Sequence, residues 1–599
     1  MSERPLRSRL RDRLFFFLAT LQALIRQRRP AELVSKAYRL WKRAGTAGVR
    51  RRIWWIGHAT LGYTRWVKQF DTLDDTDRRA ILDHIDRLRS RPRISVLMPT
   101  YNSPERWLRQ AIESVRNQLY PDWELCIADD ASPQPHVQAI LEEYQRLDER
   151  IKIVCRDRNG HISAASNSAL ELVTGEFVAL LDHDDELPEH ALYMVALALD
   201  EFPELNLIYS DEDKIDEYGH RFGPYFKPDW NPDLLGAQNM ISHLGFYRTE
   251  VLRSIGGFRV GVEGSQDWDV ALRVVEKISP STIRHIPHVL YHWRAISGST
   301  AIGHEEKSYV VSASQRVVRE HLQRINQSAS VEPAFSSFVR IRYPLPTPAP
   351  LVSIILFGDS ANSEELIRRT HYLSLEIIPC PFNNDGTLAE TINRIAKQAH
   401  GELLCLLDAG LLPEKEDWLE ELVGQARRSE IGAVGPMQLD ADGNIQSALT
   451  VLCNTSGKNR VSWSFYQGMH PQEKGVAGRA ALQQNVTILA PGCLIVRTET
   501  FRMVDGFDAK EFPNTLFELD FCLRLVQAGY RNLWTPYSRM VSTGPLKTGF
   551  EECHQNEVEQ FQMRWRDFID HDPAHNPNLV CGGEWPFPVF PPRIDYPWR

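Results

Sequence analysis

The sequence predicts an α/β protein of two tandem doubly wound units, the second of them degenerate, preceded by a basic helical N-terminal segment. Apolar strands alternate with amphipathic helices from residue 94 onward, and polar residues follow the carboxyl ends of the strands. Open α/β sheets bind their ligands at that edge. A series of short motifs occurs twice in the chain, which indicates an internal repeat.

Five parts are expected along the chain, because 599 residues exceed what one hydrophobic core holds. They are a basic helical segment (1–90), a first α/β domain (91–301), a helical segment with a Pro-rich linker (302–349), a second α/β domain (350–549), and a tail that is helical and then Pro-rich (550–599).

The N-terminal segment predicts contact with an anionic surface. Residues 1–52 carry fifteen Lys and Arg against three acids, although the whole chain has a net charge of −9. The apolar run Leu14–Ile25 is too short to span a bilayer, and no small-residue cleavage site follows it. We expect a basic amphipathic segment on anionic lipid, with packing on the protein's own body as the alternative.

The cysteine pattern indicates a reducing compartment. The nine cysteines are scattered and include no Cys-x-x-Cys pair, which also argues against structural zinc. Together with the basic segment, this predicts a cytoplasmic protein that is peripheral at the inner face of the plasma membrane.

The repeat has three pairs of matching segments. They are Pro92–Ser95 with Pro350–Ser353, Gly175–Asp182 with Gly401–Asp408, and Gly257–Arg273 with Gly506–Arg524. The first two segments are separated by 80 positions from Ser95 to Gly175 and by 48 from Ser353 to Gly401. The second copy is therefore expected to lack about one βα unit.

An apolar strand runs into three acids at Asp182, Asp184 and Asp185. Like charges at close range oppose one another's ionisation, so a divalent cation that also holds a diphosphate would explain the cluster. A solvated acidic turn is the alternative.

Polar residues follow the other predicted strands of the first block as well. The strand at 94–98 ends in Pro99-Thr100-Tyr101-Asn102, and the strand at 123–128 ends in Asp129-Asp130. A polar segment lies at 159–167, and residues 264–269 precede a helix. No Gly-x-Gly-x-x-Gly follows the first strand, which argues against a dinucleotide oxidoreductase.

In this order, the motifs of residues 92–300 resemble family 2 glycosyltransferases of the GT-A fold. The motifs Ser210–Lys214, Phe226–Trp230 and Tyr291–Arg294 are similar to large bacterial transferases that assemble O-antigen and related surface polysaccharides, with rhamnosyltransferases frequent among them. The second block and the tail resemble the second domain of that subgroup, through Gly529–Pro536 and Asn576–Leu579.

The resemblance implies a role for each motif. The turn Pro99, Thr100, Tyr101 and Asn102 would shape the nucleotide pocket and Asp130 would contact the base. The nucleotide-sugar set also includes Asp129, Asn159, Asn167 and Asp182. Asp182 and Asp184 would bind Mg²⁺ or Mn²⁺, with Asp185 as a supporting acid or helix cap. His292 would complete the metal site, or would be a structural histidine.

Asp267 matches the catalytic base of the family. A carboxylate accepts the proton of the acceptor hydroxyl during attack, and a base opposite the leaving group implies inversion. Residues two apart point away from each other on a helix, so Asp269 is expected to pair with Arg273 instead. Gln266 stands where the family usually has Glu.

The second copy departs from the pattern at each chemical position. Phe357–Ser360 replaces the first turn, Asp408 is followed by Ala409-Gly410, Glu518 occupies the position of Asp267, and Val541-Ser542 stands where relatives carry histidine. We expect a non-catalytic domain that packs on the first or holds acceptor glycan.

The predicted function is an inverting, metal-dependent glycosyltransferase. It would move a sugar from a nucleotide-diphospho-sugar, with dTDP-rhamnose favoured, to a lipid-linked oligosaccharide or a growing surface polysaccharide such as O-antigen. A non-catalytic glycan- or nucleotide-binding scaffold and a bifunctional transferase with two active domains are the alternatives. Nucleic acid is not expected as a partner, because the body is acidic and no basic stripe crosses the fold.

Overall fold

The computed structural model describes residues 30–296, 308–358, 362–380, 386–453, 460–544 and 553–599. The chain divides into two compact units. Unit 1 contains Met1–Lys227, Ile241–Ala313 and Phe587–Arg599, and unit 2 contains Pro228–Met240 and Ser314–Pro586. The basic residues 1–29, including the apolar run predicted to contact lipid, lie outside the described part.

Two helices precede the first sheet. Helix α2 spans Pro30–Phe70, with a break at Gly45, where φ is 61°. Helix α3 spans Asp75–Ile85 and begins with a capping box, in which Asp74 accepts from the backbone of Asp77 and Asp77 from that of Asp74. Over the described residues, no helix combines the length and the apolarity needed to cross a bilayer.

The sheet of unit 1 has the strand order β3-β2-β1-β4-β7-β5-β6, and β8 pairs with β5. Strands β1 to β4 are parallel to one another, whereas β7 runs antiparallel to both β4 and β5. The strands are β1 (Ile94–Thr100), β2 (Trp123–Asp129), β3 (Ile151–Cys155), β4 (Phe177–Leu180), β5 (Leu207–Ile215), β6 (Arg221–Tyr225), β7 (Gly245–Arg248) and β8 (Ile283–Arg294).

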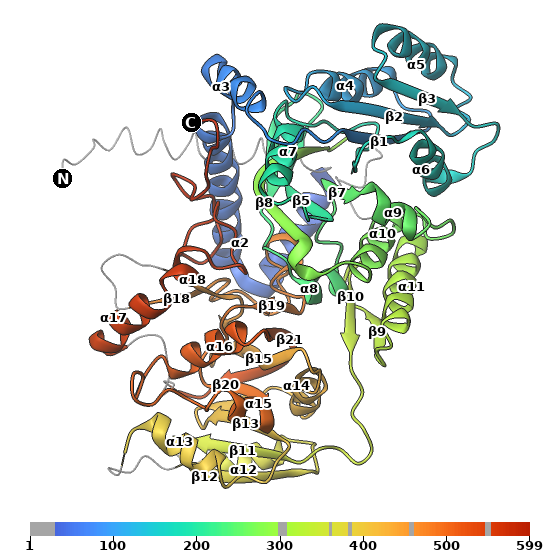
Figure 1. Cartoon of the computed structure of the whole chain (residues 1–599). Coiled ribbons are helices and arrows are strands. Elements are labelled where there is room, and N and C mark those ends of the chain that lie inside the picture. The colour runs from blue at the N-terminus through green and yellow to red at the C-terminus, as the bar shows by residue number, and fades with distance from the viewer. Residues whose placement is uncertain (1–29, 297–307, 359–361, 381–385, 454–459, 545–552) are drawn as a thin grey trace. The chain divides into compact units, whose positions relative to one another are not determined.

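Helices cover both faces of this sheet. Figure 1 shows α4 and α5 on one face of β1–β3 and α6 on the other, as expected when the crossovers reverse direction at β1. All residues of β1 and β2 are buried, and most of them are apolar, as expected for strands covered on both faces. The helices of unit 1 are α2, α3, α4 (Glu105–Arg116), α5 (Pro135–Leu147), α6 (His161–Leu172), α7 (Ala191–Glu201), α9 (Thr249–Ser254), α10 (Gln266–Val275) and the first turn of α11 (Ser308–Arg324).

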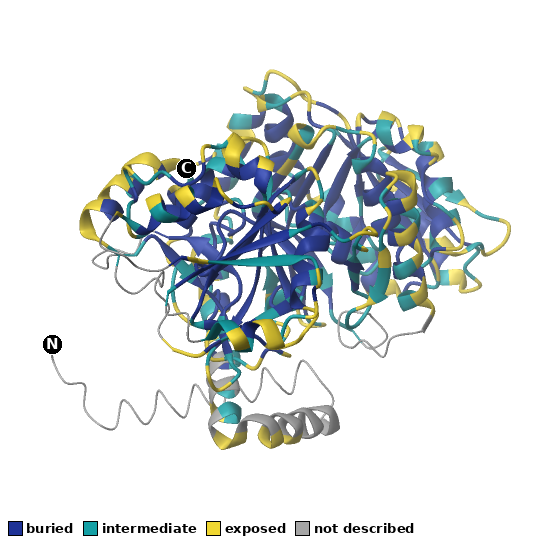
Figure 2. Cartoon of the chain, turned by 90° about the horizontal axis from the view of Figure 1, so that it is seen from below, coloured by how far each residue is buried: buried dark blue, intermediate teal, exposed yellow. Residues whose placement is uncertain are grey.

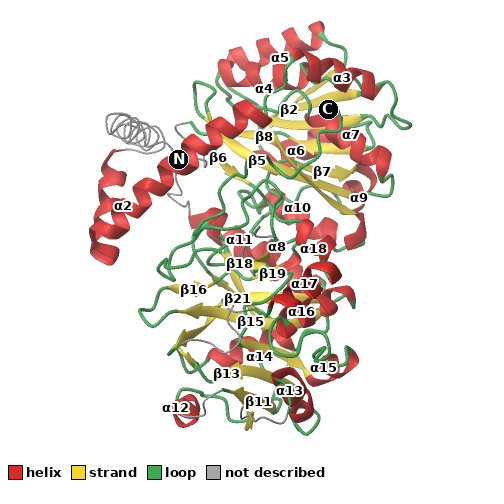
Figure 3. Ribbon diagram, turned by 90° about the vertical axis from the view of Figure 1, so that its left-hand side faces the viewer, coloured by secondary structure: helices red, strands yellow, loops and turns green. Residues whose placement is uncertain are grey.

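Unit 2 repeats this architecture, with the strand order β12-β11-β13-β20-β15-β21-β14. Its main strands are β11 (Val352–Phe357), β12 (Leu375–Cys380), β13 (Leu403–Asp408), β14 (Leu411–Pro413), β15 (Ile431–Leu439), β20 (Cys493–Arg497) and β21 (Arg531–Ser542), with β9 (Ser330–Pro333), β10 (Val339–Arg342), β16 (Ile445–Ser447), β17 (Thr450–Leu452), β18 (Ser462–Ser464) and β19 (Gln484–Val486) as shorter strands. Its helices are α8 (Pro232–Ala237), α12 (Ser363–Arg368), α13 (Leu388–Ala396), α14 (Trp418–Ala426), α15 (Thr498–Met503), α16 (Phe517–Gln527), α17 (Gln555–Arg564) and α18 (Arg566–Asp570). Figure 3 shows α12 and α13 on opposite sides of β11.

The two sheets correspond strand by strand. The order β2-β1-β4-β7-β5-β8 of unit 1 reappears as β12-β11-β13-β20-β15-β21 in unit 2. Strand β12 of unit 2 corresponds to β2 of unit 1, whose outer edge pairs with β3. Among the described strands of unit 2, none pairs with the outer edge of β12. The shorter spacing in the second copy is therefore explained by the missing β3 and its helix.

Two glycines of the repeated motifs are fixed by close backbone contact. A Cβ atom on Gly175 would lie 2.5 Å from the Arg93 carbonyl oxygen, and one on Gly401 would lie 2.5 Å from the Ser353 nitrogen. In each unit a threonine hydroxyl then donates to the glycine carbonyl at 2.6 Å, from Thr249 and from Thr498. The repeat thus conserves a packing requirement in both sheets.

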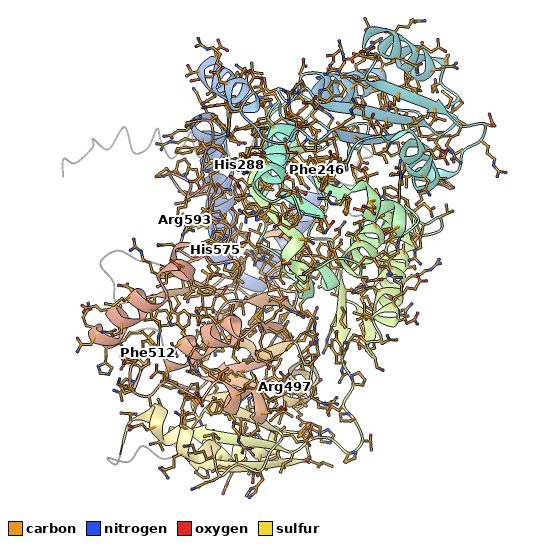
Figure 4. All side chains as sticks on the ribbon, viewed as in Figure 1. Phe246, His288, Arg497, Phe512, His575 and Arg593 are labelled. Carbon is orange, nitrogen blue, oxygen red and sulfur yellow. The ribbon has the colours of Figure 1, made fainter. Side chains whose placement is uncertain are left out.

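Residues 587–599 return to unit 1 and pack on its core. Trp598 donates from its indole nitrogen to Asp77 at 3.1 Å, and its ring lies edge-on to His190. His288 of β8, labelled in Figure 4, lies with its Nε2 3.1 Å from the Asp595 carbonyl oxygen. The central strands of both sheets are buried, whereas the edge strands β3, β6 and β12 are partly exposed (Figure 2).

Unit 1 is expected to lose stability in mild acid because of two buried histidines. Burial lowers the pKa of His190 to about 3 and that of His288 to about 4. Below pH 6.5 both histidines are protonated in the unfolded chain but stay neutral in the folded unit. The free energy of unfolding therefore falls by up to about 2.7 kcal/mol per pH unit between roughly pH 6 and pH 4. Urea unfolding at pH 7.5 and pH 5.0 measures this fall.

The control for this prediction is the exposed His220, whose imidazole contacts Asp216 on the surface. His288→Gln should flatten the acid dependence relative to the wild type, while His220→Gln should leave it nearly unchanged. An equal acid dependence in His288→Gln and the wild type would contradict the assignment.

Candidate active site

The carboxyl ends of β1, β2 and β4 meet at one edge of the unit 1 sheet. The register pairs Thr100 with Asp129, and the Asp130 N–H donates to the Thr100 carbonyl oxygen at 2.9 Å. The Leu181 N–H donates to the Leu97 carbonyl oxygen at 3.0 Å, which places Asp182 beside the end of β1. The predicted polar turns therefore adjoin one another.

The turn after β1 presents two buried polar atoms. Thr100 Oγ1 and Asn102 Oδ1 have no hydrogen-bond partner among the described residues. Asn102 has a φ of 48°, and its N–H donates to Ser132 Oγ at 2.9 Å. Tyr101 is exposed, and the Pro99 carbonyl oxygen lies 3.3 Å from His183 Nδ1. Buried polar atoms normally have partners, so Thr100 and Asn102 are suited to contact a ligand.

The two acids after β2 hold the neighbouring loops. Asp129 accepts from the Ser132 hydroxyl at 2.5 Å and from the Ser132 N–H at 3.2 Å. The carboxylate of Asp130 accepts from the Gly160 N–H at 3.0 Å and lies 2.9 Å from Arg156 Nε. Asn159 donates to the Asp130 carbonyl oxygen at 3.3 Å. Asp130 thus joins the β2 turn to the polar segment that precedes α6.

Asn167 has a structural role that recurs in unit 2. Its side-chain amide donates to the Phe258 carbonyl oxygen at 2.7 Å, and its oxygen accepts from the Phe258 N–H at 2.8 Å. Asn393 makes the same pair of bonds with Phe507, at 2.7 and 2.9 Å. Because backbone groups engage both polar atoms of Asn167, the structure gives no support to its predicted contact with the nucleotide sugar. In the sequence, the pair Asn167 and Phe258 recurs in the second copy as Asn393 and Phe507, and this recurrence could have indicated a structural role.

Three side chains form the acidic centre of the site. One ligand atom from each of Asp182, Asp185 and His243 lies within 4.8 Å of the others. Burial raises the pKa of Asp182, and the charges of Asp184 and Asp267 raise it further, while His243 lowers it. Burial and the charges of Asp184 and Asp182 also raise the pKa of Asp185.

The neighbours of the acidic centre fix its backbone. Asp185 accepts from the Tyr291 hydroxyl at 2.5 Å and from the Arg294 N–H at 2.7 Å. The Asp184 carbonyl oxygen accepts from Arg294 Nε at 2.7 Å. Two carboxylates, one half-buried and one buried, and an imidazole are ligands that Mg²⁺ or Mn²⁺ accepts, and a cation would relieve the repulsion between the carboxylates. These residues therefore fit a divalent metal.

His243 is the site residue that the sequence did not reveal. Its ring stacks on Tyr291 with a centroid distance of 4.6 Å, and its Nδ1 lies 3.5 Å from Glu212 Oε2. Although burial lowers its pKa, Glu212, Asp182 and Asp185 raise the pKa of His243 to about 9. No motif surrounds His243 in the sequence, so no spacing could have linked it to the acids.

His292, predicted as the metal-binding histidine, faces a different partner. Its Nδ1 lies 2.6 Å from Asp213 Oδ1 in the interior of unit 1. Asp213 also accepts from the Tyr63 hydroxyl and from Arg221 Nε, each at 2.6 Å. His292 does not belong to the group of Asp182, Asp185 and His243. Its contact with Asp213 fits the alternative given above, that His292 is a structural histidine.

Asp267 lies in the first turn of α10 and acts electrostatically on the acidic centre. Its charge raises the pKa of Asp182, and it contributes, after burial, to the raised pKa of Tyr247. Asp269 is fully buried, and Arg273 donates to it at 2.7 Å. The predicted ion pair of Asp269 and Arg273 is therefore present, and Asp267 is the other acid of this turn.

The equivalent acids of unit 2 are bound to the backbone. Asp408 accepts from the Gly410 N–H at 2.8 Å, and Glu518 accepts from the Gly492 N–H at 3.1 Å. Both side chains are buried. Asp520 pairs with Arg524 at 2.7 Å, as Asp269 does with Arg273. In unit 2 the ion-paired acid is present as Asp520, whereas Asp408 and Glu518, at the positions of Asp182 and Asp267, accept hydrogen bonds from backbone N–H groups.

Comparison with known families matches residues 95–256 to the model described as Glycosyl transferase family 2. Residues 95–256 form a family 2 glycosyltransferase domain. This glycosyltransferase domain contains Asp182, Asp184 and His243, whereas Asp267 lies beyond the matched residues. The predicted fold class, α/β with two tandem doubly wound units, is confirmed by the repeated strand order.

Two curated relatives cover most of the chain around the glycosyltransferase domain. Uncharacterized protein y4gI of Sinorhizobium fredii (strain NBRC 101917 / NGR234) is 36% identical over 539 residues, which are 83% of this chain and 58% of y4gI. O-antigen biosynthesis protein RfbC of Myxococcus xanthus is 33% identical over 535 residues, 84% of this chain and 41% of RfbC. The chain spans about half the length of these relatives.

Among solved structures, S. aureus TarS 1-349 in complex with UDP-GlcNAc is 20% identical to this chain. The match covers 38% of this chain and 66% of that chain, with a TM-score of 0.32.

Proposed function

We propose that unit 1 is an inverting, metal-dependent glycosyltransferase that uses a nucleotide-diphospho-sugar. The observation that carries this proposal is the placement of Asp267. It lies at the start of α10, where its charge acts on Asp182 at the carboxyl edge of the sheet. The charge of a candidate base therefore reaches the acids that would hold the diphosphate of the donor.

The reaction is a single displacement. The acceptor hydroxyl attacks the anomeric carbon, the bond from that carbon to the diphosphate breaks, and Asp267 receives the hydroxyl proton. A divalent cation held by Asp182, Asp185 and His243, with Asp185 in the place predicted for Asp184 and His243 in the place predicted for His292, would stabilise the negative charge on the departing nucleotide. Thr100 and Asn102 offer unpartnered buried atoms to the nucleotide, and Pro99 and Tyr101 shape that turn. Asp129, Asp130 and Asn159 hold the loops around it.

The donor is proposed to be dTDP-rhamnose, and the acceptor a lipid-linked oligosaccharide or a growing surface polysaccharide such as O-antigen. The similarity to O-antigen biosynthesis protein RfbC supports the polysaccharide class. The motifs shared with rhamnosyltransferases favour the sugar. Unit 2 is proposed to be non-catalytic, because Asp408 and Glu518 are engaged by backbone N–H groups.

The basic N-terminal segment is proposed to bind the inner face of the plasma membrane. In the described part of α2, Tyr38 and Trp41 are exposed, and the Lys42 ammonium lies 5.5 Å from the centre of the Tyr38 ring. Aromatic and cationic side chains together suit an anionic lipid surface. Co-sedimentation with anionic vesicles should fall when residues 1–52 are deleted, and unchanged recovery would contradict this contact.

The transfer reaction is tested by release of nucleoside diphosphate. We expect the full chain, incubated with dTDP-rhamnose, Mn²⁺ and acceptor glycan, to release dTDP, and chelation by EDTA to abolish the release. UDP-GlcNAc and GDP-mannose are the donor controls. Release that is equally fast in EDTA would contradict metal dependence, and no release from any donor would favour a scaffold.

A further inference from the structure

Lys227 is a fully buried cation whose ammonium contacts one short segment, Ile241–His243, and the acid that supports it. Its ammonium lies 3.0 Å from Glu212 Oε2 and donates to the Ile241 carbonyl oxygen at 2.7 Å. It also donates to the carbonyl oxygen of His243.

Glu212 holds the same segment from the other side. This residue of β5 accepts from the His243 N–H at 3.1 Å, and its Oε2 lies 3.5 Å from His243 Nδ1. Although burial raises the pKa of Glu212, the charges of Lys227 and His243 and their hydrogen bonds together lower it to about 2. The backbone N–H, the carbonyl oxygen and the imidazole of His243 are therefore all in contact with Glu212 or Lys227.

The position of Lys227 in the chain explains why such a fastening is needed. Residues 228–240 leave unit 1 and belong to unit 2, and the chain re-enters unit 1 at Ile241. Within unit 2 the excursion is anchored by Asn231, which donates to the Asn485 carbonyl oxygen at 2.8 Å, and by Asp233, which is paired with Arg428. Lys227 lies at the outgoing end of the excursion and binds Ile241 at the returning end. Ile241 is two residues before His243 in the chain.

Stability alone does not account for a buried pair of this kind. Replacing buried ion pairs by apolar residues is often neutral or stabilising, because desolvation offsets the Coulombic gain. A pair retained at such a position is better explained by what it orients. Ligating histidines are commonly oriented by a second residue that contacts the other ring nitrogen or the backbone.

We propose that Glu212 and Lys227 are positioning residues that hold His243 toward Asp182 and Asp185 for binding of a divalent metal. This inference rests on the metal dependence in the proposed function. It assigns the buried acid and lysine of two motifs, Ser210–Lys214 and Phe226–Trp230, to the orientation of one ligand.

Mn²⁺ affinity of the full chain without nucleotide tests the proposal, measured by calorimetry and by the electron paramagnetic resonance signal of free Mn²⁺. Glu212→Gln is expected to weaken Mn²⁺ binding about 10- to 100-fold. Asp213→Asn is the matched control, because Asp213 is equally buried on the same strand but contacts Arg221 and His292. Its Mn²⁺ affinity should stay within about twofold of the wild type, since outer residues act only on the ligand that they contact.

Two further variants separate positioning from loss of fold. The double variant Glu212→Gln with Lys227→Met leaves no unpaired buried charge, so it should fold and still bind Mn²⁺ weakly. In a His243→Ala background, adding Glu212→Gln should cost no further affinity, because both act through one ligand.

Three results would overturn the proposal. They are wild-type Mn²⁺ affinity in both Glu212→Gln and the double variant, an equal loss in Asp213→Asn, or additive losses with His243→Ala. No Mn²⁺ binding by the wild type would overturn the metal dependence of the proposed function as well, whereas wild-type binding that is insensitive to Glu212 would overturn the positioning role alone.

Discussion

Replacing Asp267 with Asn is expected to lower the rate of sugar transfer by about 10²- to 10⁴-fold, the contribution that a positioned general base makes. The amide keeps the size of the side chain but cannot accept the hydroxyl proton. Asp267 is not part of the Asp269–Arg273 ion pair that fastens α10, so the fold should persist. Steady-state release of nucleoside diphosphate in the presence of acceptor measures the loss.

Glu518→Gln is the matched control, because Glu518 occupies the position of Asp267 in the second copy. Transfer should proceed at nearly the wild-type rate in this variant. Nucleotide binding should be retained in Asp267→Asn, which would separate a lost base from a lost pocket. If Asp267→Asn transferred sugar as fast as the wild type, or if Glu518→Gln were equally impaired, the assignment of the base would be wrong.

Replacing Asp182 with Asn is expected to remove metal-dependent binding of the nucleotide, with a loss of at least about tenfold in affinity for nucleoside diphosphate and Mn²⁺. Asp182 shares the acidic centre with Asp185 and His243, and the negative charges of Asp184 and Asp267 act on it. Calorimetric titration of dTDP, UDP and GDP with and without Mn²⁺ measures the loss and identifies the nucleotide.

The same substitution should raise the thermal stability of the metal-free protein. Burial and like charges raise the pKa of Asp182, so its ionised form is unfavourable at neutral pH and a neutral amide relieves that repulsion. Asp408→Asn, the equivalent change in unit 2, should leave nucleotide binding unchanged. Two metal-dependent sites in the wild type would instead indicate that both units bind donor, and a lower melting temperature in Asp182→Asn would point to misfolding.

The sequence predicted those features that local pattern determines. The apolar strand that ends in acids predicted that Asp182 lies at the carboxyl edge of the sheet. The repeated motifs predicted that the two sheets correspond and that the second copy lacks one βα unit. The pairing of Asp269 with Arg273 followed from their spacing on one helix. In each case the residues that cooperate lie close together in the chain or recur in order.

The features that the sequence missed depend on contacts between distant segments. His243 joins Asp182 only because the chain returns to the sheet after residue 240, and nothing near His243 indicates that path. His292 follows a recognisable motif, yet the buried Asp213 of a neighbouring strand takes its ring. The resemblance implied that Asn167 contacts the nucleotide sugar, whereas the structure shows its amide donating to the Phe258 carbonyl oxygen, 91 residues further along the chain.

The exchange of segments between the two units also constrains how the protein is made. Residues 587–599 complete the core of unit 1, where Trp598 reaches Asp77, but the ribosome synthesises them after all of unit 2. Residues 228–240 emerge long before their partners Arg428 and Asn485. Neither unit can therefore finish folding while the other is still absent, and neither can be excised as one contiguous piece. A recombination event that moved either half alone would separate each unit from part of its own core.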